Sequence, residues 1–297
     1  MHPVFFRLGS IVGYSYGLMI GIGALLAIFV SQWRAKRRGL DGDLVFSAAV
    51  WGLFAGLLGA KLTFIASNIK LLFSDPGSVL GADGFTVYGG VVLGILVGGL
   101  IVRHAKVDVP LYLDLVIPQI ALAQCFGRIG CFLAGCCYGR PTHSHFGVVF
   151  PPEAIAPSGI PLIPTQLISA AGDFLIFIIL ILLSNFATDY LKVGKAKSGA
   201  DLLDQNVASP KKSFLQPPAI SGMYLILYGI GRFAIEFLRA DPRKTALGLT
   251  SNQFVSIVFL IVGIALIAYG FKRAKNKTSG DTPASEVPKE GCLEEEA

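Results

Sequence analysis

Two arginines stand inside apolar sequence, where charged side chains are seldom tolerated. Arg128 lies within IPQIALAQCFGRIGCFLAGCCYGRP, and Arg232 lies within SGMYLILYGIGRFAIEFLR. An ionised side chain at the centre of a bilayer costs roughly 2.5–3.5 kcal/mol on insertion scales, so such residues normally face a bundle interior or a wet cavity. A guanidinium donates planar, bidentate hydrogen bonds to phosphate. The two arginines therefore predict one anionic site, and the abundant phosphate-bearing molecule of a bilayer is a phospholipid.

Other polar side chains accompany these arginines. Tyr228, Arg232 and Glu236 are spaced i, i+4 and i+8, so a helix would place them on one face. Arg232 and Glu236 could pair, either to fix helix packing or to orient the arginine toward a phosphate. Asp173 is a further acid in an apolar run. Glycines around Arg128 are typical of close helix packing, which accounts for the glycines but not for the arginine.

Thiols and imidazoles are concentrated just after Arg128. Cys131, Cys136, Cys137, His143 and His145 lie within fifteen residues. Thiolates and imidazoles can bind zinc or copper, and cysteines can cycle to a disulfide. However, no C-x-x-C is present, the spacing matches no standard zinc site, and small cysteines pack well between helices. A thiol-based redox or metal protein therefore stays an alternative, while packing is the simpler interpretation.

Composition indicates what must position these residues. The chain has 297 residues, of which 53% are hydrophobic and 15% charged, and its mean hydropathy is +0.65. Soluble domains carry nearer 25% charged residues, so lipid is the predicted solvent. A helix needs about 20 apolar residues to cross a bilayer core. We therefore predict an all-α, multi-pass bundle with about seven spans, near 13–33, 44–66, 85–103, 111–136, 164–186, 219–239 and 252–271.

The basic residues fall between the apolar stretches, which is the pattern of membrane topology and not of nucleic-acid binding. If the N-terminus lies outside, sixteen lysines and arginines face inward, in 34–38, 103–106, 192–212 and 272–289. Five face outward, namely Arg7, Lys70, Arg140, Arg243 and Lys244. The positive-inside rule therefore predicts that the N-terminus is outside and the C-terminus inside.

The polar segments divide the chain further. Residues 1–273 are predicted to form a single transmembrane catalytic domain, with a polar cytoplasmic loop at 187–218. Residues 274–297 read as a disordered cytoplasmic tail, because they are charged and lack periodicity. Between the fourth and fifth spans, 138–163 is rich in Pro, Gly and aromatic residues. It would lie at the outer face, either as an ordered arm at the membrane interface or as a plain loop.

Five sequence motifs, which follow one another along the chain, indicate a resemblance to a known family. They are SYGLM at 15–19, YGG at 88–90, GRIGCFLAGCCYGR at 127–140, PTQL at 164–167 and SGMYLILYGIGRFAIEFLR at 221–239. With these motifs the chain resembles the prolipoprotein diacylglyceryl transferase family from about Tyr16 to Phe271. The resemblance implies transfer of a diacylglyceryl group from phosphatidylglycerol to the lipobox cysteine of a prolipoprotein signal peptide. This reaction releases glycerol 1-phosphate and is the first step of lipoprotein maturation. The resemblance also implies that the protein lies in the bacterial inner membrane, in contact with other membrane lipids.

The resemblance also implies residue roles. Arg128 and Arg232 match essential arginines of the family, which we interpret as a phosphate clamp that stabilises the leaving group. Tyr16 and Tyr228 match functional tyrosines that could hydrogen-bond the headgroup. No cofactor and no metal are expected for this reaction. Further residues that the resemblance assigns to the substrate site are Gly139, Gln166, Glu236 and Arg239.

The chain departs from the family pattern at four positions, namely Tyr88, Cys131, Ala134 (where a second Asn is usual) and Cys136. Many members have His-Gly-Gly, with the histidine as base, where this chain has Tyr88 before two glycines. A free tyrosine has a pKa of about 10 and a thiol of about 8.5, so neutral Tyr88 is a poor proton acceptor. We favour activation of the thiol by the arginines, with Tyr88 as a positioning hydrogen-bond donor in the catalytic site. Cys131 and Cys136 replace the usual Asn and Glu, which leaves open a family-like phospholipid-binding or thiol-based protein without transferase activity.

Overall fold

The computed structural model describes residues 4–8, 11–81, 84–186, 216–240, 245–246 and 249–280. Most of the predicted loop 187–218 and residues 281–297 of the predicted tail lie outside the described residues. The last helix continues to Gly280, past the predicted boundary at 273, because no proline or glycine interrupts 272–279.

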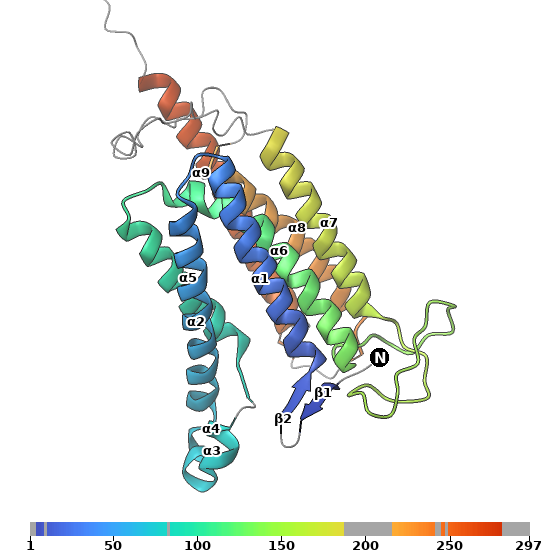
Figure 1. Ribbon diagram of the computed structural model, residues 1–297. Helices are drawn as coiled ribbons and strands as arrows, with labels where there is room; N and C mark the ends of the chain where they lie inside the picture. The colour runs from blue at the N-terminus through green and yellow to red at the C-terminus, as the bar shows by residue number, and fades with distance from the viewer. Residues whose placement is uncertain are drawn as a thin grey trace, which may run out of the picture.

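Seven long helices form one bundle in the described part of the chain (Figure 1). Each covers one predicted apolar stretch, so the all-α prediction is confirmed. They are α1 (Ser15–Arg37), α2 (Gly42–Ser67), α5 (Val87–His104), α6 (Val109–Ala134), α7 (Thr165–Phe186), α8 (Ala219–Glu236) and α9 (Ser251–Gly280). The sequence did not predict the small elements, which are β1 (Val4–Leu8), β2 (Ile11–Tyr14), α3 (Ile69–Ser74), α4 (Pro76–Leu80), β3 (Thr245–Ala246) and β4 (Leu249–Thr250).

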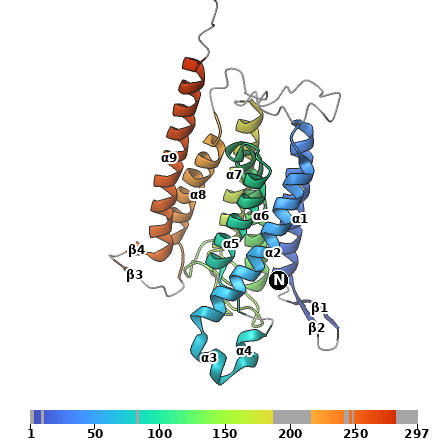
Figure 2. The same cartoon turned by 90° about the vertical axis from the view of Figure 1, so that its left-hand side faces the viewer.

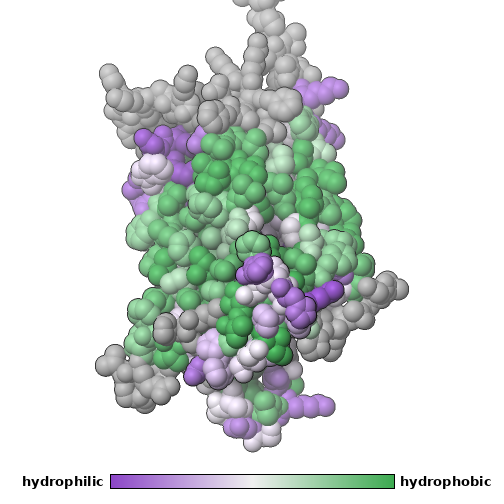
Figure 3. Space-filling model, turned by 90° about the vertical axis from the view of Figure 1, so that its right-hand side faces the viewer, coloured by the Kyte–Doolittle hydropathy of each residue, from purple (hydrophilic) through white to green (hydrophobic). Residues whose placement is uncertain are grey.

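Six of the long helices are long and apolar enough to cross a membrane, namely α1, α2, α5, α6, α7 and α9. The surface supports the same conclusion, because a hydrophobic belt lies between two hydrophilic ends (Figure 3). Helix α8 is less apolar, since Arg232 and Glu236 interrupt it, yet it packs lengthwise on α9. A multi-pass membrane protein is therefore confirmed, while a count of seven spans stays a prediction.

The centre of the bundle lies where α6, α7 and α8 meet. Leu180 of α7 and Ile220 of α8 are fully buried there, together with Ala121 of α6. Asp114 of α6 fixes the start of α8, because its carboxylate accepts hydrogen bonds from the backbone N–H groups of Ile220 and Ser221 at 3.2 and 2.8 Å. A carboxylate at a helix N-terminus satisfies amides that lack helical partners and opposes the helix dipole.

The two ends of the bundle differ (Figure 2). One end carries both hairpins, α3 and α4. At the other end, Arg34 donates hydrogen bonds to Leu115 O at 3.1 Å and to Ser184 Oγ at 2.8 Å, and Arg273 forms an ion pair with Asp108 at 2.7 Å. Assignment of this arginine-bearing end to the cytoplasm remains a prediction.

Residues 138–163 form an ordered arm and not a plain loop. Leu162 forms bridges with both Pro141 and Val148. Phe150, only 1% exposed, packs edge-on against Phe132 of α6, with ring centroids 6.0 Å apart. The arm therefore has a small core of its own, which is attached to the last turn of α6.

Candidate functional site

Arg128 of α6 faces an acid on α7. Its Nε lies 4.0 Å from Oδ2 of Asp173, and the two side chains are 19% and 7% exposed. Within the described residues, Asp173 Oδ2 is buried without a hydrogen-bond partner. The ion pair is therefore loose, which leaves the hydrogen-bond donors of the guanidinium available for another anion.

Arg232 forms the ion pair that the i, i+4 spacing predicted. Its guanidinium nitrogen lies 3.7 Å from Oε2 of Glu236 on α8, and the side chain of Glu236 is only 2% exposed. Asn252 of α9 donates hydrogen bonds to the same carboxylate at 3.3 and 3.5 Å. Glu236 is thus held from two helices and can orient Arg232. No pattern in the sequence indicates Asn252, which lies twenty residues further along the chain than Arg232.

The two pairs belong to one site. Arg232 interacts electrostatically with Arg128 and with Arg239, and Asp173 interacts with both Arg128 and Arg232. Like charges repel strongly where water is scarce. Among the described residues, three arginines face two carboxylates here, so the ionised site has an excess of positive charge. The arrangement can hold the single negative charge of a phosphate diester.

Two predicted tyrosines border this charge cluster. Tyr228 stacks on Tyr224, with ring centroids 5.7 Å apart, and it interacts with both Arg128 and Arg232. Tyr16 lies at the start of α1 and interacts with Arg128. Its ring is close to Gly130, where an added Cβ would lie 3.2 Å from the ring. The structure therefore brings both tyrosines to the arginines.

Tyr88 is placed differently. It lies in the first turn of α5, which packs on α2, and it is 62% exposed. Within the described residues, the Tyr88 side chain has no hydrogen bond, ring contact or electrostatic interaction, with the arginines or with any other group. Its catalytic role therefore stays a prediction from the resemblance.

Gly139 joins the arm to the end of α8. It forms a bridge with Arg239 and donates a backbone hydrogen bond to Ile163 O at 3.0 Å. An added Cβ would lie 2.7 Å from Ile163 O and 2.8 Å from Leu238 O. Only glycine fits between these two backbones, so this residue sets the position of Arg239. A direct contact of Gly139 with substrate stays a prediction.

Gln166 and its neighbour hold the chain just after α6. Gln166, at 1% exposure, donates from Nε2 to Cys136 O at 2.7 Å. Thr165, also 1% exposed, donates from Oγ1 to Cys137 O at 2.7 Å. Gln166 Oε1 has no hydrogen-bond partner among the described residues. The predicted site residue Gln166 therefore anchors the segment that carries the cysteines.

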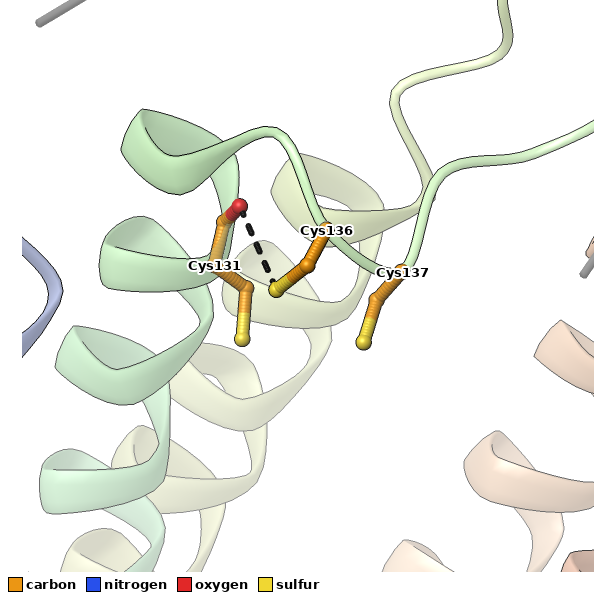
Figure 4. Close-up of side chains that lie close together, drawn as sticks. All are labelled: Cys131, Cys136 and Cys137. Atoms are coloured by element: carbon orange, nitrogen blue, oxygen red, sulfur yellow. Dashed lines mark hydrogen bonds between the residues drawn. The ribbon is translucent and has the colours of Figure 1, made fainter. Parts of the chain in front are cut away.

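Three cysteines converge at the end of α6 (Figure 4), and Arg128 and Arg239 interact with them. Gly135 ends α6 in the left-handed conformation, with φ of 74°, and Cys136 N donates to Cys131 O at 3.1 Å. This reversal, a common way to end a helix, turns the chain back on α6. The sulfurs of Cys131, Cys136 and Cys137 then lie within 4.8 Å of one another. His143 and His145, which the metal alternative included, are exposed on the arm and outside this group.

Comparison with known proteins places the chain in a family. The sequence profile described as prolipoprotein diacylglyceryl transferase matches residues 3–199 and 202–269. A phosphatidylglycerol–prolipoprotein diacylglyceryl transferase of Clostridium tetani is 40% identical over 266 residues, which cover 89% of this chain and 96% of the relative. The transferase 2 of Clostridium perfringens is 38% identical over 91% of this chain and 96% of its own length. A Dehalococcoides mccartyi transferase is 28% identical over 92% and 95%. The chain is therefore a member of the prolipoprotein diacylglyceryl transferase family.

Proposed function

We propose that this protein transfers a diacylglyceryl group from phosphatidylglycerol to the lipobox cysteine thiol of prolipoproteins and releases glycerol 1-phosphate. The observation that carries the proposal is the pair of arginines Arg128 and Arg232. They lie on different helices of an apolar bundle, each beside one carboxylate, and they interact with each other. Relatives that match nearly the whole chain carry the name of this activity.

The reaction makes three demands on the protein. A thiolate displaces a phosphate ester at a glycerol carbon, so the phosphate must be held, the leaving oxygen must be stabilised, and the thiol must lose its proton. Arg128 and Arg232 supply the first two, since fixed cations act most strongly in a site with little water. Glu236 orients Arg232, and Asp173 lies beside Arg128. Tyr16 and Tyr228 lie where a phenol could donate a hydrogen bond to the headgroup.

The location follows from the chemistry of the substrates. Phosphatidylglycerol and the signal peptide of a prolipoprotein both reside in the bacterial cell membrane, and the multi-pass bundle shares that solvent. With the N-terminus outside, the arm and the arginine pair lie toward the outer leaflet. Nothing in the charge distribution favours a nucleic-acid partner.

The decisive experiment is transfer to a lipobox peptide in vesicles that contain phosphatidylglycerol. Loss of one such electrostatic contact lowers turnover by about 100–1,000-fold, so Arg128→Ala and Arg232→Ala should each lose at least this much. Arg140→Ala is a matched control, because Arg140 is an exposed residue of the arm and should leave turnover unchanged. Full turnover in both arginine variants would refute the clamp.

Growth of a strain depleted of its own transferase tests the activity as a whole. The wild-type chain should restore growth, and Arg128→Ala should not. If the wild-type chain inserts in the membrane but neither restores growth nor transfers lipid in vesicles, the family-like alternative without transferase activity is correct.

A further inference from the structure

The three clustered thiols match the dimensions of a zinc site. Zinc–sulfur bonds of about 2.3 Å place two sulfurs of a tetrahedral site about 3.8 Å apart. The sulfurs of Cys131, Cys136 and Cys137 all lie within 4.8 Å of one another, and all three cysteines are free thiols. Movement of each sulfur by less than about an ångström would therefore close the site around one ion.

The backbone that carries the three cysteines is fixed in one conformation by buried hydrogen bonds. Cys137 has φ of 63°, in the left-handed region that residues other than glycine adopt only when their surroundings impose it. Thr165 and Gln166 impose it here, since each donates a 2.7 Å hydrogen bond to a carbonyl of the cysteine pair. Metal ligands are commonly fixed by such buried outer hydrogen bonds.

The cluster also has an open position and favourable charge. Among the described residues, the group consists of the three cysteines, with no histidine or carboxylate as a fourth member. Three protein ligands and one open position are typical of catalytic zinc, whereas structural zinc has four protein ligands. Three thiolates and Zn²⁺ carry one net negative charge, and Arg239 beside Cys137 and Arg128 beside Cys131 offset it.

We propose that Cys131, Cys136 and Cys137 bind one Zn²⁺ ion, and that the lipobox thiol of the prolipoprotein becomes its fourth ligand and thereby the nucleophile. This inference rests on the transferase function proposed above. Tetrahedral coordination by four sulfurs is typical of zinc. Figure 4 shows the sulfurs of Cys131 and Cys137 pointing the same way from the two sides of the turn, with that of Cys136 between them.

The displacement of the phosphate ester by the zinc-bound thiolate needs no further reactant. Coordination to zinc releases the thiol proton, because a coordinating thiol is deprotonated outright. The sulfur electron pair forms the bond to the glycerol carbon, and the carbon–oxygen bond to phosphate breaks. The leaving phosphate oxygen takes that bonding pair and one proton, and the thioether product is a weak ligand that departs. No electron is gained or lost, and no side chain is needed as a base where the family's histidine is replaced by Tyr88.

Metal analysis of the purified protein is the first test. The wild-type chain should hold about one zinc per chain, and Cys131→Ser, Cys136→Ser and Cys137→Ser should each lower the zinc affinity by about tenfold or more. Cys125→Ser is the matched control, because Cys125 is a free, buried thiol of α6 outside the cluster. It should keep both zinc and turnover.

X-ray absorption at the zinc edge gives a readout that is independent of turnover. A lipobox peptide should raise the sulfur ligands of zinc from about three to about four, and the same peptide with serine in place of cysteine should not. A fourth sulfur before peptide is added, an unchanged count with peptide, copper in place of zinc, or a disulfide among the three cysteines would each overturn the inference.

The two proposals fail in different ways. If the wild-type protein transfers lipid while zinc is absent, or if all three serine variants keep full turnover, the zinc inference is wrong and the transferase function stands. If the zinc-loaded wild-type protein transfers no lipid from phosphatidylglycerol, the proposed function is wrong, and with it the role of zinc in that reaction.

Discussion

Replacement of Gly139 by alanine should damage the enzyme although it adds only one methyl group. The new Cβ would lie 2.7 Å from Ile163 O and 2.8 Å from Leu238 O. Both are backbone atoms, one from the arm and one from the residue before Arg239, so neither can move away as a flexible side chain would. The two backbones must separate by several tenths of an ångström.

The expected loss of stability follows from the contacts that this separation of the two backbones would strain. Gly139 N donates to Ile163 O at 3.0 Å, and Arg140 N donates to Leu238 O at 2.9 Å. Each hydrogen bond contributes about 0.5–1.5 kcal/mol, and overpacking of this kind costs about 1–3 kcal/mol. We therefore expect the free energy of unfolding to fall by about 2 kcal/mol. Because a shift of about 1 Å in a positioning group can lower turnover about 100-fold, Arg239 should become less effective.

Thermal unfolding in detergent and peptide lipidation in vesicles measure the two effects of Gly139→Ala. The matched control is Gly99→Ala in α5, since an added Cβ at Gly99 would have no atom of another described element within 4 Å. Alanine is favoured over glycine within a helix, so this control should keep its stability and turnover. If Gly139→Ala unfolds at the wild-type temperature and lipidates peptide at the wild-type rate, the junction between arm and α8 does not position the site.

Three further predictions concern single side chains. Asp114→Ala should lower the free energy of unfolding by about 3 kcal/mol, because buried amides at the start of α8 lose their acceptor; Asp114→Asn keeps one acceptor oxygen and should lose less in the same melting experiment. Asp173→Asn should destabilise the protein less in nanodiscs of phosphatidylglycerol than in those of phosphatidylcholine, since the phosphate of phosphatidylglycerol has no headgroup cation to offset its charge and can replace the missing charge beside Arg128; equal losses in both lipids would contradict this. Tyr88→Phe should keep turnover within about tenfold of wild type, because a lost hydrogen bond to substrate costs about 0.5–1.5 kcal/mol, whereas loss of an obligatory base would remove more.

Much of the fold was predictable because lipid imposes strict demands on sequence. A helix that crosses a bilayer must be apolar for about 20 residues, so each long helix left a readable stretch. Helix α8 shows the limit of that signal, because Arg232 and Glu236 lower its hydropathy while the bundle covers them. The short hairpins and α3 were not predicted, since a few residues at the membrane surface carry no comparable periodicity.

Parts of the site were predictable from the sequence where a single side chain carries the chemistry. The parts that depend on backbone geometry were not predictable. Arg128 and Arg232 are visible because a charge in apolar sequence needs a reason. The packing of Gly139 between two backbones depends on residues at both ends of the arm, which no local spacing reveals. Likewise, the cysteine cluster arises from the reversal at Gly135 and the left-handed Cys137, and a search for C-x-x-C spacing does not detect it.

The distance between Arg128 and Cys131 suits the reaction that both proposals describe. They are spaced i, i+3 on α6, and side chains at this spacing have Cβ atoms about 5–6 Å apart on one face of a helix. In the displacement, the sulfur must approach the glycerol carbon to about 3–3.5 Å, and that carbon is joined to phosphorus through a single oxygen. The nucleophile and the phosphate are therefore separated by about one helical turn. A helix that presents an anion-binding arginine and, one turn later, a ligand of the metal that holds the nucleophile brings the two reacting groups to about that separation without movement of the backbone.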